Sequence, residues 1–402
     1  MNRIYLDNAA TTAVAPEVLQ TMLPYFTEHY GNPSSVHATG RDARKAIEEG
    51  RRQVAVAINA QPQEIYFTAG GTESDNWAIK GAAFANRKKG NHIITTAVEH
   101  HAVLHTCAWL EKQGFKVTYL PVDAEGFVTA KQVEDAITDE TILITIMTAN
   151  NEIGTLMPIA EIGEVAKAHK ILFHTDAVQA VGAVPLDVKA LNVDMLSMSG
   201  HKFHGPKGIG ALYIRRGVRL DIFMQGGAQE RGQRAGTENL AGIVGMGKAI
   251  ELATTNLPEK AAKIAALRDR LMNGIVERIP DVRINGPKDP SRRLPNNCNV
   301  SVRYIEGESM LLRLDLAGIA ASSGSACTSG SLDPSHVLLA IGLPHEVAHG
   351  SLRMTLGSDT TEADIDAVLD VLPGIVSDLR AMSVLNHETT TVSDETFACP
   401  RA

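Results

Sequence analysis

A lysine in a run of small residues is the first candidate for chemistry in this chain. Lys202 follows Ser199, Gly200 and His201 and precedes a glycine-rich turn, and an apolar segment at 193–198 comes before it. A partly desolvated amine there can form a Schiff base with an aldehyde, and neighbouring donors can hold a phosphate. An ordinary surface lysine is the alternative that this segment alone leaves open.

A glycine turn between a strand and a helix offers the phosphate a second set of donors. Gly71 and Thr72 follow the apolar run 65–68 and open a helical pattern. Glycines let the backbone approach an anion, and the N–H groups of a helix N-terminus carry positive partial charge. A simple turn with Thr72 as the helix cap is the alternative. No GxxxxGKS or GxxxxGKT sequence occurs, which argues against a nucleotide P-loop.

Two polar residues follow predicted strands at the edge where open α/β sheets bind ligands. Asp176 comes after the run 171–174, and a carboxylate there can pair with a protonated pyridine nitrogen or simply cap the next helix. His100 follows the run 92–96, where an imidazole can lie on an aromatic cofactor or move a proton. A histidine-bound metal is the competing idea. No Cys or carboxylate cluster stands at ligand spacing, so we expect no metal site.

Two further residues are unusual for their surroundings. Cys327 lies among Gly, Ser, Thr and Ala in the segment 322–330, which we expect to be a mobile, exposed loop. A thiol there can become a thiolate and act as a nucleophile, whereas the alternative is an inert cysteine. Arg353 lies between apolar neighbours at 351–356. Its planar guanidinium suits a carboxylate in two hydrogen bonds, and a structural ion pair is the alternative.

The composition is that of an ordinary globular protein. The chain has 402 residues, 44% of them hydrophobic and 21% charged, and a net charge of −8. Negative charge argues against a nucleic-acid surface, and no apolar run reaches the length of about 20 residues that a membrane span needs. The N-terminus does not have the pattern of a signal peptide. Four cysteines without a CxxC pair suit a reducing cytoplasm, where we expect the protein to act.

Strand and helix patterns alternate along the first part of the chain. Strands are predicted at 65–68, 92–96, 117–120, 142–147, 171–174, 195–199 and 211–214, and helices at 41–58, 73–86, 102–113, 129–136 and 158–169. This alternation predicts an α/β fold with a mostly parallel sheet covered on both faces.

A second, shorter α/β set begins near residue 258, with a helix at 258–279, strand-like segments at 300–304 and 351–356, and helical patterns at 309–316 and 362–379. We predict a large domain at 15–257 and a small C-terminal α/β domain formed by 1–14 and 258–382. The polar residues 383–402 are predicted to be a flexible tail.

Taken together, the motifs resemble the cysteine desulfurases, pyridoxal-phosphate enzymes of the aminotransferase-like fold. The likeness runs from Tyr5 to about Leu379, and the Ser-Gly-Ser-Ala-Cys-Thr-Ser-Gly loop is similar to that of the subgroup serving iron–sulfur and nitrogenase assembly. The matching segments are YLDNAATT at 5–12, GNPSS at 31–35, GTES at 71–74, EH at 99–100, NNEIG at 150–154, HTDAVQ at 174–179, SGHK at 199–202, QERG at 229–232 and SGSAC at 323–327.

The resemblance implies a role for each candidate. Lys202 would carry pyridoxal 5'-phosphate and shuttle protons, and Cys327 would attack the sulfur of L-cysteine and become a persulfide, leaving L-alanine. Asn151 and Arg353 would hold the substrate carboxylate. The remaining residues would hold the cofactor: Asp176 at the ring nitrogen, Gln179 at the ring hydroxyl, His100 stacked on the ring, and Gly71, Thr72, Ser199 and His201 at the phosphate, with Thr237 reaching it from the partner in a homodimer.

The resemblance also implies a sulfur acceptor, an iron–sulfur scaffold protein or another carrier. The nitrogen-fixation branch often has Asn where this chain has Ala9 and Ser or Cys where it has Ala69, which favours a general over a nitrogenase-specific role. Two alternatives stay open at this point: a selenocysteine lyase or aminotransferase on the same fold, and a sulfur carrier without catalysis.

Overall fold

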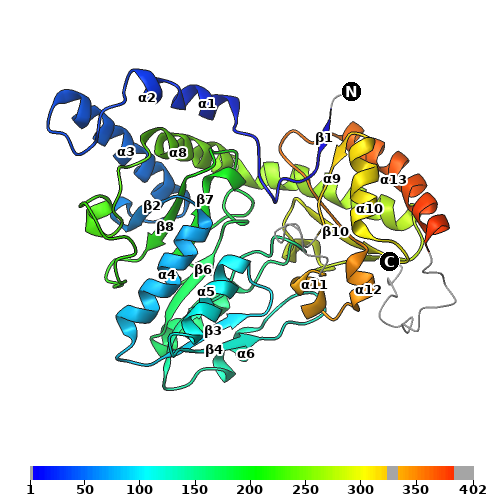
Figure 1. Ribbon diagram of the computed structural model, residues 1–402, viewed down its shortest axis with the longest axis horizontal. Coiled ribbons are helices and arrows are strands. Elements are labelled where there is room, and N and C mark those ends of the chain that lie inside the picture. Colours follow the sequence, from blue (N-terminus) through cyan, green and yellow to red (C-terminus); the bar gives the residue numbers. More distant parts are fainter. Residues whose placement is uncertain (1–2, 324–333, 384–402) are drawn as a thin grey trace.

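The computed structural model describes residues 3–323 and 334–383 (Figure 1). Of the predicted cysteine loop at 322–330, residues 324–330 with Cys327 lie outside these ranges, and so does the predicted flexible tail at 383–402 apart from Ser383. Within them, no helix has both the length and the apolar composition needed to cross a membrane.

The central sheet has seven strands in the order β2-β8-β7-β6-β5-β3-β4. Only β8 runs against its neighbours β2 and β7, so the sheet is mostly parallel, as predicted. The strands are β2 (Ile65–Thr68), β3 (His92–Thr96), β4 (Lys116–Leu120), β5 (Thr141–Thr145), β6 (Leu172–Asp176), β7 (Met195–Ser199) and β8 (Gly210–Ile214).

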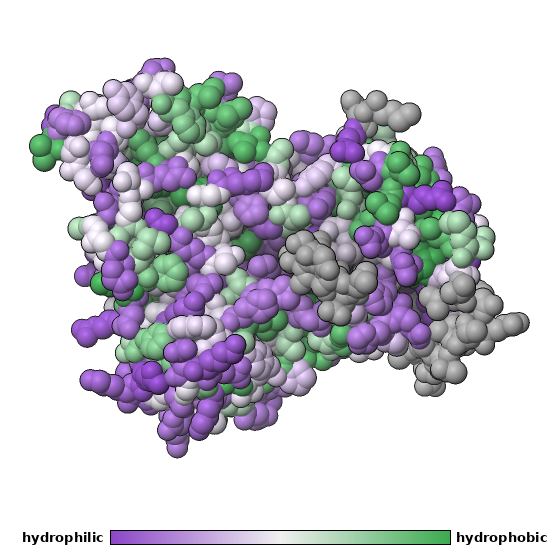
Figure 2. Space-filling view, in the orientation of Figure 1, coloured by the Kyte–Doolittle hydropathy of each residue, from purple (hydrophilic) through white to green (hydrophobic). Residues whose placement is uncertain are grey.

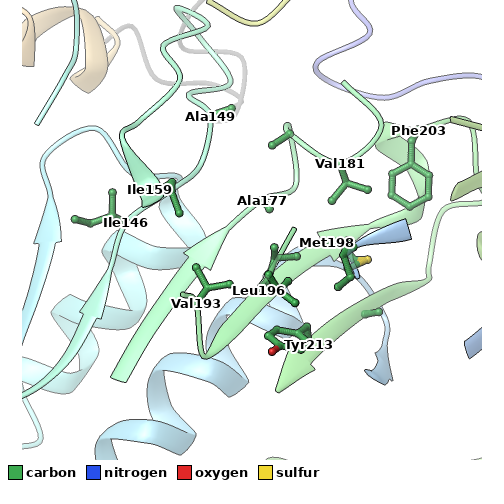
Figure 3. Packing of buried hydrophobic residues seen from close by; sticks show 14 of the residues in the cluster. Ile146, Ala149, Ile159, Ala177, Val181, Val193, Leu196, Met198, Phe203 and Tyr213 are labelled. Carbon is green, nitrogen blue, oxygen red and sulfur yellow. The ribbon is translucent and has the colours of Figure 1, made fainter. Parts of the chain in front are cut away.

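Apolar side chains pack against both faces of this sheet. Successive residues of a strand point to opposite faces, and along β8 Leu212 and Tyr213 belong to two different hydrophobic clusters. Tyr213 packs with Leu196 and Met198 of β7 in the cluster drawn in Figure 3. Sheets covered on both faces bind ligands beyond the carboxyl ends of their strands.

The helices of this region are α1 (Pro16–Met22), α2 (Pro24–Thr27), α3 (Ala38–Ala57), α4 (Gly71–Asn86), α5 (His101–Glu111), α6 (Ala130–Asp135), α7 (Ile159–His169) and α8 (Leu240–Thr254), with 3-10 turns at η1 (Pro62–Glu64), η2 (Gly200–Lys202) and η3 (Glu230–Gly232). The sequence patterns did not predict α8. Ten of its residues are buried, and Lys248 and Glu251 are its only charged residues, so its polar face is too narrow to reveal a helix by spacing.

The C-terminal region is built on an antiparallel sheet of order β12-β10-β9 and a parallel pair β1-β11. Leu6, near the N-terminus, is buried in the same cluster as residues of α9 and α13, so the first residues of the chain pack with this region. We propose that residues 1–14 and 258–382 form a small domain beside a large domain at 15–257. The elements are β1 (Ile4–Tyr5), β9 (Val282–Ile284), β10 (Asn297–Val302), β11 (Ile319–Ala320), β12 (Ser351–Thr355), α9 (Leu257–Arg278), η4 (Pro290–Arg292), α10 (Gly307–Leu316), α11 (His336–Ala340), α12 (His345–His349) and α13 (Glu362–Met382).

The N-terminal segment crosses from one region to the other. Asn8 N donates to Thr355 O at the end of β12 over 3.3 Å, and Thr12 N donates to His201 O over 3.0 Å. Residues 7–13 therefore run past the carboxyl end of β7 (Figure 1). The candidate lysine lies in the turn η2 that follows this strand.

Candidate active site

A cleft of about 700 Å³ opens at the N-terminus of α4. Four of the predicted phosphate ligands line it together: Gly71, Thr72, Ser199 and His201. A Cβ on Gly71 would lie 2.6 Å from Val178 Cγ2, so only glycine lets the start of α4 approach the sheet this closely. The cleft therefore combines helix N–H groups, two hydroxyls and an imidazole, a donor set that suits a phosphate.

Lys202 follows His201, which lines this cleft, in the 3-10 turn η2 after β7. Its Nζ donates to Ala9 O over 2.5 Å and to Ala10 O over 2.8 Å. Gln179 Nε2 donates to the same Ala9 carbonyl over 3.0 Å. Lys202 and Gln179 thus converge on one atom of the crossing N-terminal segment.

Asp176 ends β6 beside this lysine. Its carboxyl is buried, and its Oδ1 accepts a hydrogen bond from Val178 N over 2.9 Å. Burial raises the pKa of Asp176 to about 6, while the Val178 N–H and the Lys202 charge act in the opposite direction. A cationic ring nitrogen placed here would favour the ionised carboxylate.

His100 caps the N-terminus of α5, where its Nδ1 accepts from Ala102 N over 3.1 Å. Burial lowers the pKa of His100 to about 4, and the positive charge of Lys202 adds to this effect. The imidazole is therefore neutral at physiological pH and close enough to Lys202 to feel its charge. A neutral flat ring suits stacking on an aromatic cofactor.

Glu99 is a buried acid that holds the turn before His100 in place. Burial raises the pKa of Glu99 to about 8. Its carboxyl accepts from Thr96 Oγ1 over 2.7 Å and from Met147 N over 3.1 Å. This residue thus joins the carboxyl end of β3 to the residues that follow β5.

Arg353 and Asn151, the residues predicted to bind the substrate carboxylate, contact each other outside the lining of the cleft at α4. Arg353, in β12, is 2% exposed, and its Nη1 donates to Asn151 O over 3.3 Å. Its Nη2 donates to Asp7 Oδ1 over 3.1 Å. Asn150 fixes the turn that carries Asn151, because its Oδ1 accepts from Glu152 N over 2.9 Å.

The segment that contains Cys327 joins the described chain beside these residues. Ser322 N donates to Arg353 O over 3.1 Å, and Arg353 N donates to Ser322 O over 2.7 Å. On the other side of the segment, Ser335 Oγ donates to the Glu152 carboxylate, next to Asn151. The residues on both sides of the predicted cysteine loop are thus bound to the turn and strand predicted to hold a substrate carboxylate.

The two cysteines in the described part of the chain are poor candidates for a reactive thiolate. Cys107 and Cys298 are both buried. Burial raises the pKa of both thiols, that of Cys298 to about 12. Neither forms a thiolate at neutral pH.

Thr237 is the predicted ligand that the chain does not bring to its own cleft. It is exposed and, among the described residues, is not one of those that line the cleft. Its segment is nevertheless attached beside the cleft, because Arg234 Nε donates to Glu73 Oε1 over 2.7 Å in the first turn of α4.

Sequence reasoning missed several residues that complete the site. Asp7 and the carbonyls of Ala9 and Ala10 belong to a segment whose resemblance was noted but to which no role was given. Lys207, which also lines the cleft, was visible in the glycine-rich turn after Lys202. The contacts of Asp7, Ala9 and Ala10 join positions nearly 200 or more residues apart, so no local spacing could have revealed them.

Comparison with known families matches residues 4–368 to the aminotransferase class-V model. A Clostridium botulinum protein named cysteine desulfurase IscS is 62% identical over 386 residues, 96% of this chain and 97% of the relative. A Methanosarcina thermophila protein of the same name is 61% identical over 95% of this chain and 94% of its own.

Solved structures give the same result. A NifS-like protein superimposes with a TM-score of 0.88 at 40% identity, over 94% of this chain and 100% of its own. A structure described as SspA in complex with cysteine superimposes with a TM-score of 0.78 at 40% identity, over 89% of this chain and 100% of its own.

Proposed function

Because this chain belongs to the aminotransferase class-V family and, within it, to the cysteine desulfurases, we propose that it converts L-cysteine to L-alanine and passes the sulfur to an acceptor. One observation carries this proposal at the level of the site. The N-terminal segment contacts Lys202 through Ala9 and Ala10 and contacts Arg353 through Asp7, so an amine and a carboxylate receptor face one site.

We propose pyridoxal 5'-phosphate as the cofactor, because the donor set fits it. Gly71, Thr72, Ser199 and His201 would hold its phosphate, as the lining of the cleft suggests. When bound, the cofactor supplies an aldehyde for an amine and a ring that takes up electrons. Asp176 would keep the ring nitrogen protonated, Gln179 would turn its amide from Ala9 O to the ring hydroxyl, and His100 would stack on the ring.

Arg353 and Asn151 would bind and orient the amino acid. Arg353 would donate to the α-carboxylate, and the Asn151 amide would fix its second oxygen. Lys202 would take the α-proton and return a proton to the carbon that becomes the methyl group of alanine. The Cys327 thiolate would attack the substrate sulfur, so that an S–S bond forms, the C–S bond breaks, and its electron pair stays with carbon.

A homodimer is part of the proposal. Leu19 of α1, Leu23 between the two helices and Phe26 of α2 are 46%, 47% and 61% exposed and form an apolar surface visible in Figure 2. In a homodimer, a second copy of the chain would remove these apolar side chains from water. Thr237, which is exposed in one chain, would then reach the partner's phosphate site.

We propose that the sulfur acceptor is an iron–sulfur scaffold protein or a similar carrier, and that the enzyme acts in the cytoplasm. The names of the relatives support the first part, since several are called IscS. A general role in iron–sulfur assembly is favoured over a nitrogenase-specific one.

The test is the yield of alanine and sulfide from the purified enzyme given cysteine, with and without a thiol reductant. We expect equal amounts of alanine and released sulfur without any keto acid, which separates a desulfurase from an aminotransferase. Cys327→Ala should still bind cysteine but lose persulfide formation, while Cys298→Ala, the buried control, should keep it. Full sulfide production by Cys327→Ala would favour direct elimination from the substrate and refute the proposed role of this thiol. Faster turnover of selenocysteine with no cysteine turnover would favour the lyase.

A further inference from the structure

Asp7 forms an ion pair with Arg353, the residue that is proposed to bind the substrate carboxylate. Its Oδ1 accepts from Arg353 Nη2 over 3.1 Å, and its side chain is 21% exposed against 2% for the arginine. The backbone fixes this contact, because Asn8 N and Thr355 N bond across the two segments, to Thr355 O and Leu6 O. The two backbone segments that carry the pair are thus bound to each other on either side of Asp7.

The guanidinium is only partly satisfied by these contacts. Nη1 donates to Asn151 O over 3.3 Å and Nη2 to Asp7, whereas Nε is buried with no hydrogen-bond partner in the described part of the chain. A buried donor without a partner is costly, and here it lies in a site that is proposed to take a carboxylate. One edge of the arginine therefore remains for a second anion.

Negative charge at Asp7 opposes the arrival of that anion. Burial raises the pKa of Asp7, and the charges of Arg353 and Lys202 act against this rise. The same two cations would attract an incoming α-carboxylate, so Asp7 and the substrate compete for one pair of positive charges.

We propose that Asp7 is the resident counter-ion of Arg353, a positioning residue that lowers the affinity of the site for every α-carboxylate. This inference rests on the proposed function. It adds that Asp7 keeps the guanidinium oriented in the free enzyme and weakens binding of the substrate and of the product alanine by the same physical means. The carboxylate, which both ligands share, is the group that Asp7 opposes.

The experiment uses the holoenzyme with Asp7→Asn, which removes the charge and keeps the shape and one acceptor oxygen. We expect KM for cysteine and Kd for alanine to fall together, by roughly threefold to tenfold, the range for a partly exposed ion pair. The value of kcat should change less than KM. Asp7→Glu, which restores the charge, should bring both constants back toward the wild-type values.

Two controls isolate the carboxylate. Asp315→Asn breaks the exposed ion pair with Arg3, four residues before Asp7 and away from the site, and should leave both constants unchanged. Cysteamine, a thiol amine without a carboxylate, should bind equally well to wild type and Asp7→Asn.

Unchanged or weaker alanine binding in Asp7→Asn would overturn the inference, as would tighter binding of cysteamine. If the wild type neither turns over cysteine nor binds alanine, the proposed function fails first. An active wild type with an unaffected Asp7→Asn variant refutes the inference alone.

Discussion

Replacing Arg353 with lysine tests the carboxylate site directly. In the structure the guanidinium uses separate nitrogens for Asp7 and the Asn151 carbonyl and has a buried Nε left over. An ammonium ends in a single nitrogen, so lysine cannot keep both contacts and also present two parallel donors to a carboxylate. The loss should be about 1–3 kcal/mol, the range for hydrogen bonds to a charged group. This corresponds to an increase in KM of roughly 5- to 150-fold, at tenfold per 1.4 kcal/mol.

The assay is steady-state alanine production over a range of cysteine concentrations, with cofactor content measured in parallel. Cofactor content should stay at the wild-type level, because Arg353 is not among the described residues that line the cleft at α4. Arg313→Lys is the matched control, since Arg313 pairs with Asp378 at 3.8 Å on the exposed side of α10. If Arg353→Lys has the same KM as Arg313→Lys, Arg353 is a structural ion-pair residue and the carboxylate site lies elsewhere.

Three further predictions concern the lysine, the dimer and a buried ion pair. Borohydride reduction followed by peptide mapping should place the cofactor on Lys202, and a label on Lys207 would contradict the assignment. Thr237→Ala dimers should lose activity, and mixing them with Lys202→Ala subunits should restore it, since one site of each mixed dimer is intact; no recovery would mean that Thr237 serves its own chain, and a fully active Thr237→Ala dimer would mean that it serves no site. Arg51→Met should lower the free energy of unfolding in urea by about 3–5 kcal/mol, because Glu230, bound at 2.8 Å, keeps a buried charge without its partner. An unchanged urea transition would contradict this reasoning.

The local parts of the fold were predictable because their signals lie in contiguous residues. The bounds of β2, β3 and β7 were predicted to the residue, since apolar runs flanked by polar turns mark buried strands. The residues that we propose to hold the cofactor carry the same kind of local signal. Asp176 is the last residue of β6, and Gly71 and Lys202 come three residues after the ends of β2 and β7. The carboxyl ends of parallel strands meet at one edge of the sheet.

The patterns failed where burial removes periodicity or where an element is short. The helix α8 is mostly buried and has only two charged residues, and β1 and β11 have two residues each, so neither kind carries a readable repeat. The role of Thr237 was implied by resemblance alone, and in one chain this residue is exposed and outside the cleft lining.

Sequence alone determined which residue types follow which strands, and with them the class of chemistry. Tertiary structure decided what those residues touch. Asp7 reaches Arg353 across 346 positions, and the Ala9 carbonyl receives both Lys202 and Gln179. These contacts arise because the N-terminal segment pairs with β12 and then crosses to β7. Pairing between distant segments depends on the packing of the whole chain, which no local propensity encodes.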